Sequence, residues 1–196
     1  GKQGVAIAKS AAARGARVTL IGANITEVSG VNFVGVSTAL ELQSALDAVL
    51  PDSDFLVMTA AVSDFRVKQV SDVKVKRSVV GSNPTLELVA NPDILQLAVS
   101  KIKDLGLSTK TVGFAAETAS DISQLRQLAA HKLMAKGCDL LVANDVSEGR
   151  VFGSTDNSVL ILSKTGVERS VEGTKAQVAS AVLDILCLLY TSDAAD

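Results

Sequence analysis

Short apolar runs alternate along the chain with longer segments in which apolar residues recur at helical spacing. The short runs predict buried strands, and the longer segments predict helices. Strands are expected at residues 17–21, 31–36, 55–58, 86–89, 111–115 and 139–143, with a hairpin at 159–162 and 167–171. Helices are expected at residues 5–14, 38–50 and 122–136, after Asn91 as N-cap, and from 173 to about 186. This order predicts an α/β fold: a Rossmann-like, doubly wound and mainly parallel sheet with helices on both faces.

Small or polar residues follow three of the predicted strands. They are Ala60-Ala61, Ala115-Ala116 and Asn144-Asp145. Because ligands of open α/β sheets bind at the carboxyl ends of the strands, these ends should share one edge. We expect that edge to gather Asp64, Glu117, Asn144 and Asp145 near the glycine segment that opens the chain.

Composition narrows the class of protein. Hydrophobic residues make up 47% of the 196 residues and charged residues 20%, which is typical of a globular domain. The net charge of −2 argues against a general nucleic-acid or membrane surface, so an anion site should be local. No apolar run reaches the length of a membrane span, and two cysteines fit a reducing, cytoplasmic setting.

A basic loop follows Asp64. It contains Lys68, Lys74, Lys76 and Arg77. A carboxylate beside several cations suits a metal-bound polyphosphate, because the carboxylate can hold a divalent ion or a ribose hydroxyl and the lysines can neutralise phosphate oxygens. A strand that runs into a solvated basic loop is the alternative interpretation.

Besides an enzyme that binds a metal-bound polyphosphate, the residues alone leave two function classes open. A short-chain-type NAD(P)-dependent oxidoreductase would share the opening glycine, helix and strand, but it needs a Tyr–Lys pair, and the only tyrosine is Tyr190. The second strand also lacks an acidic residue for an adenosine ribose, since Gly22-Ala23-Asn24 stands there. A non-catalytic nucleotide-binding module is the other alternative.

Six motifs occur in one order along the chain. They are Gly1-Lys2-Gln3-Gly4, Ala60-Ala61-Val62-Ser63-Asp64-Phe65, Lys74-Val75-Lys76, Asn91-Pro92-Asp93-Ile94, Gly113-Phe114-Ala115-Ala116-Glu117-Thr118 and Ala143-Asn144-Asp145-Val146. Together they resemble the phosphopantothenate–cysteine ligase family over residues 1–186. The resemblance implies a CTP- and Mg²⁺-dependent homodimeric ligase of coenzyme A biosynthesis. In it, the carboxylate of 4′-phosphopantothenate attacks CTP, and cysteine displaces CMP from the acyl-cytidylate.

The resemblance also implies roles for residues. Asp64 matches a nucleotide-binding aspartate that could hold ribose or the magnesium ion, and Lys74 matches the catalytic loop lysine that reaches the triphosphate. The remaining expected CTP-binding positions are Ala60, Ala61, Pro92, Asp93, Ile94, Leu95, Phe114, Lys132 and Lys136, and Gly1 and Gly4 belong to the expected phosphate loop. Phe114 as a simple core residue is the alternative for that position, and a solvated helix face is the alternative for the two α-helical lysines.

Both ends of the sequence look incomplete. By the resemblance, a first strand, a substrate loop and an asparagine should precede Gly1, as should an FMN-dependent decarboxylase domain in bacterial relatives. We therefore expect the chain by itself to lack ligase activity. Residues 187–196, Cys-Leu-Leu-Tyr-Thr-Ser-Asp-Ala-Ala-Asp, break the preceding helical pattern and resemble a translated sequencing adapter, so we predict that they are a non-native tail.

Overall fold

The computed structural model describes residues 1–71, 73–146 and 156–193. Its strands are β1 (Thr19–Ala23), β2 (Asn32–Val36), β3 (Phe55–Met58), β4 (Phe65–Val67), β5 (Leu88–Ala90), β6 (Lys110–Glu117), β7 (Leu140–Asp145), β8 (Asp156–Ser163) and β9 (Glu168–Thr174). Its helices are α1 (Lys2–Ala13), α2 (Ala39–Val49), α3 (Arg77–Val80), α4 (Ile94–Asp104), α5 (Ile122–Lys136) and α6 (Lys175–Asp193), with a 3₁₀ turn at Leu50–Asp52. The predicted alternation of strands and helices is confirmed over most of the chain.

The central sheet has five strands in the order β3-β6-β7-β8-β9. β3, β6 and β7 run parallel, because helices connect them, while β8 and β9 form the expected antiparallel hairpin beside β7. β1 and β2 form a separate parallel pair. The α/β class is therefore confirmed, but the parallel strands lie in two sheets, and no described strand joins β1 to β3.

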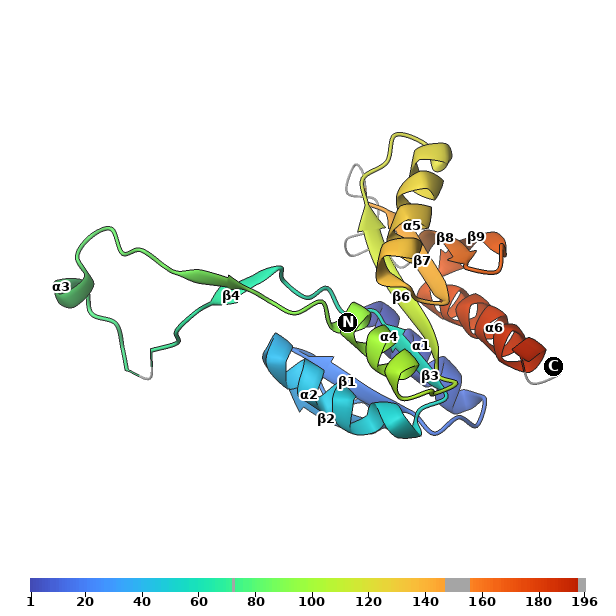
Figure 1. Ribbon diagram of the computed structural model, residues 1–196, viewed down its shortest axis with the longest axis horizontal. Coiled ribbons are helices and arrows are strands. Elements are labelled where there is room, and N and C mark those ends of the chain that lie inside the picture. Colours follow the sequence, from blue (N-terminus) through green and yellow to red (C-terminus); the bar gives the residue numbers. More distant parts are fainter. Residues whose placement is uncertain (72, 147–155, 194–196) are drawn as a thin grey trace.

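Helices cover both faces of the central sheet (Figure 1). On one face, Leu141 and Ala143 of β7 pack in a core with Leu95 of α4 and Leu133 of α5. On the other face, Val112 and Val142 pack against α6. This alternation follows from the two-residue period of a strand, so successive residues of β6 and β7 belong to different cores.

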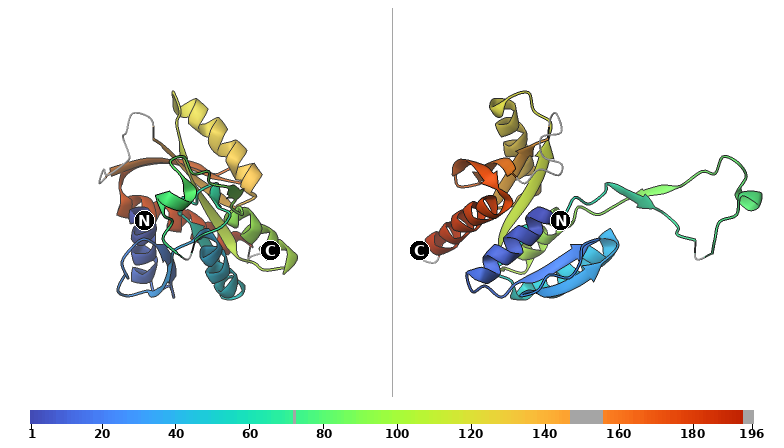
Figure 2. Two further views of the ribbon diagram at one scale, coloured as in Figure 1. Left: turned by 90° about the vertical axis from the view of Figure 1, so that its left-hand side faces the viewer. Right: turned by 180° about the vertical axis from the view of Figure 1, so that it is seen from behind.

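A long arm projects from the body of the molecule between β3 and α4. It consists of the antiparallel pair β4–β5 and the short helix α3 at its far end (Figures 1 and 2). The sequence predicts β5 but not β4, which lies in the expected basic loop. At the base of the arm, the Asn91 N–H donates to the Asp64 carbonyl over 2.8 Å, and the Asn91 side chain donates to the Ser63 carbonyl over 2.8 Å.

Two details of the helix ends differ from the sequence predictions. The N-cap of α4 is Asp93, which accepts a hydrogen bond from the Gln96 N–H, so the prediction of Asn91 as cap is wrong. Asn91 holds the base of the arm instead. Helix α6 continues to Asp193, so the helix does not stop at the start of the predicted tail, although the non-native origin of that tail stays a prediction.

Candidate functional site

The carboxyl edge of the parallel strands is stepped. β3 ends at Met58, opposite Gly113, whereas β6 and β7 continue side by side to the pair Glu117–Asp145. The residues of β6 after Gly113 therefore have no strand partner on the β3 side among the described residues. Helices α4 and α5 border this step. The predicted site residues that lie on or beside them are Pro92, Asp93, Ile94, Leu95, Lys132 and Lys136.

Two lysines of α5 reach carboxylates at this edge. The Lys132 Nζ lies 2.5 Å from the Glu117 Oε1 at the end of β6. The Lys136 Nζ pairs with the Asp93 carboxylate at the start of α4. The four-residue spacing places both ammonium groups on one face of α5, as predicted. The structure therefore brings together Asp93, Lys132 and Lys136, and adds Glu117 to them.

The first turn of α4 can contribute backbone N–H groups to the site, but not the side chains of Ile94 and Leu95. Ile94 and Leu95 are buried in the core, and a Cβ at Gly113 would lie 2.8 Å from the Leu95 Cδ2. Leu95 therefore packs directly on the backbone of β6, which Gly113 permits. The N–H groups of this turn and the positive end of the helix dipole remain as the means by which Pro92 to Leu95 could favour an anion.

Phe114 lies on the other face of the sheet from the two lysines. It is half-buried and packs with Val57 of β3 and with the cores formed by α1 and α6. Since Ala115 and Glu117 belong to the α4–α5 side, Phe114 could contact a nucleotide only around the end of β3, where the sheet is stepped. Its role in nucleotide binding stays a prediction.

Ala60, Ala61 and Asp64 connect β3 to the arm. All three are exposed, and the small alanines leave the backbone accessible just beyond the end of β3. Lys74 lies further along, between β4 and α3, in the part of the arm that projects away from the body (Figure 1). The structure does not bring Lys74 to the lysines of α5 within one chain. Asp64, by contrast, stays at the base of the arm.

Gly1 and Gly4 begin α1, and both allow close packing. A Cβ at Gly4 would lie 2.5 Å from the Thr59 Oγ1 just after β3, and one at Gly1 would lie 2.6 Å from the Ile25 Cγ2. The start of α1 therefore meets the carboxyl end of β3. The contact with Thr59 explains Gly4 without a ligand, and the contact with Ile25 explains Gly1 in the same way. Their predicted part in a phosphate loop is untested.

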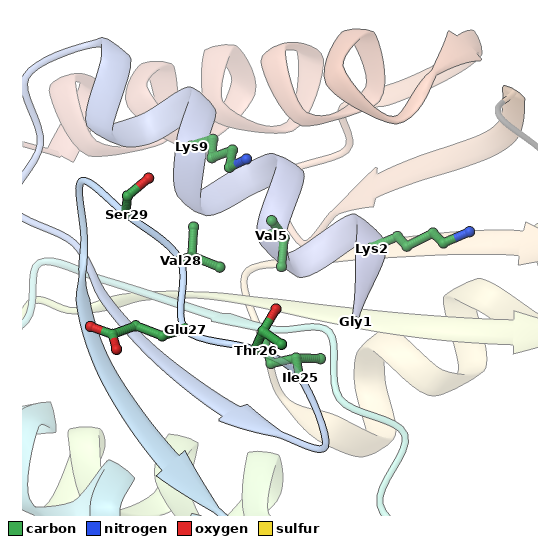
Figure 3. Close-up of a pocket in the computed structure, with 9 residues that line it drawn as sticks. All are labelled: Gly1, Lys2, Val5, Lys9, Ile25, Thr26, Glu27, Val28 and Ser29. Atoms are coloured by element: carbon green, nitrogen blue, oxygen red, sulfur yellow. The ribbon is translucent and has the colours of Figure 1, made fainter.

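A cavity of about 520 Å³ lies between α1 and the loop after β1. Figure 3 shows Val5 and Val28 between these two segments, with the Lys2 ammonium directed away along the helix. Gly1 is the one predicted site residue among those that line the cavity. The other predicted site residues therefore do not line this cavity.

Asp64 is the carboxylate that the sequence predicts as a ligand of Mg²⁺, and it is exposed. Among residues 1–71, 73–146 and 156–193, no group of three or more His, Cys, Asp or Glu side chains is arranged to hold a metal ion. Mg²⁺ commonly binds through one or two carboxylates together with substrate phosphates. An exposed Asp64 fits that mode, in which the ion arrives with the nucleotide.

Two buried titratable groups lie just before the amino end of β7. Burial raises the pKa of the Cys138 thiol to about 11, so this thiol is protonated at neutral pH. Burial would also raise the pKa of Asp139, but hydrogen bonds from Lys164 and from the Thr111 N–H and hydroxyl outweigh it and lower that pKa. Cys138 is therefore a small core residue and Asp139 a structural carboxylate.

Within the described part of the chain, no helix is long and apolar enough to cross a bilayer. Residues 1–189 match the family described as the DNA/pantothenate metabolism flavoprotein C-terminal domain. The chain is 43% identical over 192 residues to the coenzyme A biosynthesis bifunctional protein CoaBC of Mycobacterium tuberculosis, an alignment that covers 95% of this chain and 46% of that protein. The chain thus spans about half the length of the curated relatives it matches.

Solved structures agree with these sequence similarities. The crystal structure of the C-terminal domain of a CoaBC protein superposes with a TM-score of 0.73 and 28% identity, covering 96% of this chain and 83% of that one. A Cab2 mutant in complex with phosphopantothenate-cysteine superposes with a TM-score of 0.70 at 14% identity, covering 100% of this chain and 79% of that one. At this low identity, the similarity to the Cab2 mutant shows the fold alone.

Proposed function

Because the chain belongs to the family of DNA/pantothenate metabolism flavoprotein C-terminal domains, we propose that it is the part of a coenzyme A biosynthesis protein that joins 4′-phosphopantothenate to cysteine. The substrate carboxylate attacks the α-phosphorus of CTP, the bond to pyrophosphate breaks, and an acyl-cytidylate forms. The cysteine amine then attacks the acyl carbon, loses a proton and releases CMP. The bifunctional CoaBC name of the relatives and the phosphopantothenate-cysteine complex of the Cab2 mutant support this substrate class.

One observation supports a nucleotide at the stepped edge above all others. Lys132 and Lys136 project from one face of α5 toward carboxylates at the ends of β6 and α4, beside the N–H groups of the first turn of α4. Two cations and a helix N-terminus together favour a polyphosphate. We assign the triphosphate of CTP to this place.

Mg²⁺ enters the proposal as an ion held between Asp64 and the phosphates. Asp64 is exposed at the base of the arm, just beyond Ala60 and Ala61, where the backbone is open to a ligand. When bound, the ion neutralises charge on the phosphate oxygens and on the leaving pyrophosphate. Among the predicted site residues, Asp64 is the exposed carboxylate that lies beyond the end of β3, where an ion can reach it.

We also propose a homodimer, and the surface of the arm supports it. Its exposed apolar side chains are those of Phe65, Val70, Val73, Val75, Leu86 and Leu88. An exposed apolar surface on a projecting two-stranded ribbon is typical of an interaction site. We propose that a second copy of the chain binds this surface. The arm carries the segment with Lys74 away from the body of its own chain, so a dimer would bring that segment to the body of the partner (Figure 2).

Titration calorimetry with CTP, ATP and NAD⁺ in the presence of Mg²⁺ tests the nucleotide class directly on this chain. We expect CTP to bind and NAD⁺ not to bind. Binding of NAD⁺ alone would favour the dinucleotide-dependent oxidoreductase. Pyrophosphate release with CTP, phosphopantothenate and cysteine, from the chain extended by the amino-terminal strand that the family resemblance implies, distinguishes a ligase from a nucleotide-binding module.

A further inference from the structure

We propose that Glu117 is a positioning residue, which fixes the Lys132 ammonium group where the nucleotide phosphates bind. The proposal rests on the CTP-dependent function proposed above and assigns a task to a residue that has none in it. The Lys132–Glu117 ion pair, with 2.5 Å between Nζ and Oε1, is the contact that carries it.

Glu117 is rigidly held. Its backbone pairs with Asp145 in the β6–β7 ladder, and its carbonyl accepts a hydrogen bond of 2.8 Å from the Val146 N–H. Its side chain is 14% exposed, and its Oε1 is fully buried and lacks a hydrogen bond of good geometry within the described residues. A buried carboxylate oxygen of this kind depends on a nearby cation, since an uncompensated charge is costly in the interior. Lys132 is that cation.

Lys132 is the mobile partner of the pair. Its side chain is 43% exposed, and a lysine side chain has several rotatable bonds whose freedom is lost when the ammonium group is fixed. An ammonium group has three donors, so a contact with Glu117 leaves donors for phosphate oxygens. Glu117 therefore restricts Lys132 before the ligand binds, and a ligand that meets a preorganised group binds more tightly.

The second lysine of the site lacks an equivalent buried partner. Asp93, which pairs with Lys136, has a side chain that is 38% exposed and also caps α4 through the Gln96 N–H. Elsewhere on α5, Arg126 forms a two-pronged ion pair with Glu168 of β9. That pair lies outside the candidate site and provides a matched control on the same helix.

A double-mutant cycle on CTP affinity tests the proposal. Glu117→Gln should weaken CTP binding by about tenfold, which is the size expected for the loss of one well-placed charged contact. In a Lys132→Met background the same Glu117→Gln change should alter affinity less than twofold, because its effect passes through Lys132. Glu168→Gln should leave CTP affinity unchanged. Thermal melting of each variant checks that it is folded.

Other results would overturn the proposal. Equal weakening of CTP binding by Glu117→Gln in both backgrounds would show that Glu117 acts independently of Lys132. Tighter binding would show that Glu117 competes with phosphate for the lysine. If Glu117→Gln does not fold, Glu117→Asp keeps the charge on a shorter side chain, and unchanged CTP affinity in that variant would contradict positioning. Wild-type protein that does not bind CTP would refute the proposed function instead.

Discussion

At the residue scale, the cations of the site differ in what surrounds them. Lys132 and Lys136 are paired to carboxylates on the body, whereas the segment that holds Lys74 lies on the arm. A cation that approaches the phosphates only during reaction stabilises the transition state more than the bound ground state. This difference separates binding lysines from a lysine that acts on the leaving group.

Lys74→Ala should therefore slow pyrophosphate release by roughly 10²-fold while leaving CTP affinity largely intact, as expected for the loss of one transition-state contact. The assay measures pyrophosphate release by the extended chain described above, and calorimetry measures CTP affinity. Lys76→Ala, two residues further along the same arm, is the matched control. Unchanged turnover together with weakened CTP affinity would assign Lys74 to ground-state binding.

Asp139 should make stability depend on pH. Its pKa is lowered in the folded protein, so its contribution is present above the pKa of an unfolded aspartate, about 3.9, and is lost as the pH falls through the lower folded value. Asp139→Asn should lower the free energy of unfolding by about 1–3 kcal/mol at pH 7. Denaturant unfolding at pH 7, 5 and 3 should show this gap narrowing only below about pH 4. A constant gap would exclude the charge as its cause.

The two cysteines should differ sharply in reactivity. Burial raises the pKa of Cys138 to about 11, whereas Cys187 is exposed on α6. Because the thiolate is the reactive species, a chromogenic disulfide reagent at pH 8 should label Cys187 quickly and Cys138 only after unfolding. Cys187→Ser should abolish the fast phase. Rapid labelling of both thiols in the native protein would contradict the buried position of Cys138.

At the element scale, α4 is held on the sheet by contact between its first turn and the backbone of β6. Gly113→Ala would bring a Cβ to within 2.8 Å of the Leu95 Cδ2 and 3.1 Å of the Leu141 Cδ1. We expect a loss of about 1–3 kcal/mol in the free energy of unfolding, since overpacking of a filled core costs that much. Chemical denaturation measures it, with Gly35→Ala, where the nearest atom is at 3.5 Å, as control. Equal losses would argue against a filled core at Gly113.

The elements of the body are largely predictable from the sequence, and those of the arm are not. The helix at Ile122–Lys136 follows from local signals and is confirmed, and of the two residues that could cap α2, Ser37 and Thr38, the structure has Thr38. β4 has no such signal, because it is only three residues long and pairs only with β5. The sequence does not identify the N-cap of α4, because Asn91 and Asp93 are both residues that favour this position. The hydrogen bonds of Asn91 at the base of the arm leave the cap to Asp93.

The site is predictable in part, for a similar reason. The spacing of Lys132 and Lys136 places them on one face of a helix, but their carboxylate partners depend on how α5 and α4 pack on the sheet. The small residues before Glu117 place it at the carboxyl edge of the sheet. The sequence alone does not predict that it pairs with Lys132. The orientation of Phe114 toward α1 and α6 depends on which face of β6 those helices cover.

At the scale of the whole molecule, the apolar surface of the arm should drive self-association. Val73→Asp places a charge on a side chain that is 76% exposed, so it should not disturb the fold but should shift the protein from dimer to monomer. Sedimentation velocity measures the assembly state over a range of concentrations. Val167→Asp, on the β8–β9 hairpin of the body, is the control and should remain dimeric. A wild-type protein that is monomeric at high concentration would refute the proposed homodimer.

The closed base of the arm has a consequence for how this protein can change over evolutionary time. The chain leaves the body near Ser63 and returns at Asn91, and the hydrogen bonds between these points make the arm a single long connection. The entropy of closing a loop grows only slowly with its length, so insertions, deletions and substitutions in the arm between Asp64 and Asn91 should barely affect the folding of the body. Descendants of one ancestral sequence can therefore acquire new arms, and new partner preferences, while they inherit the same body.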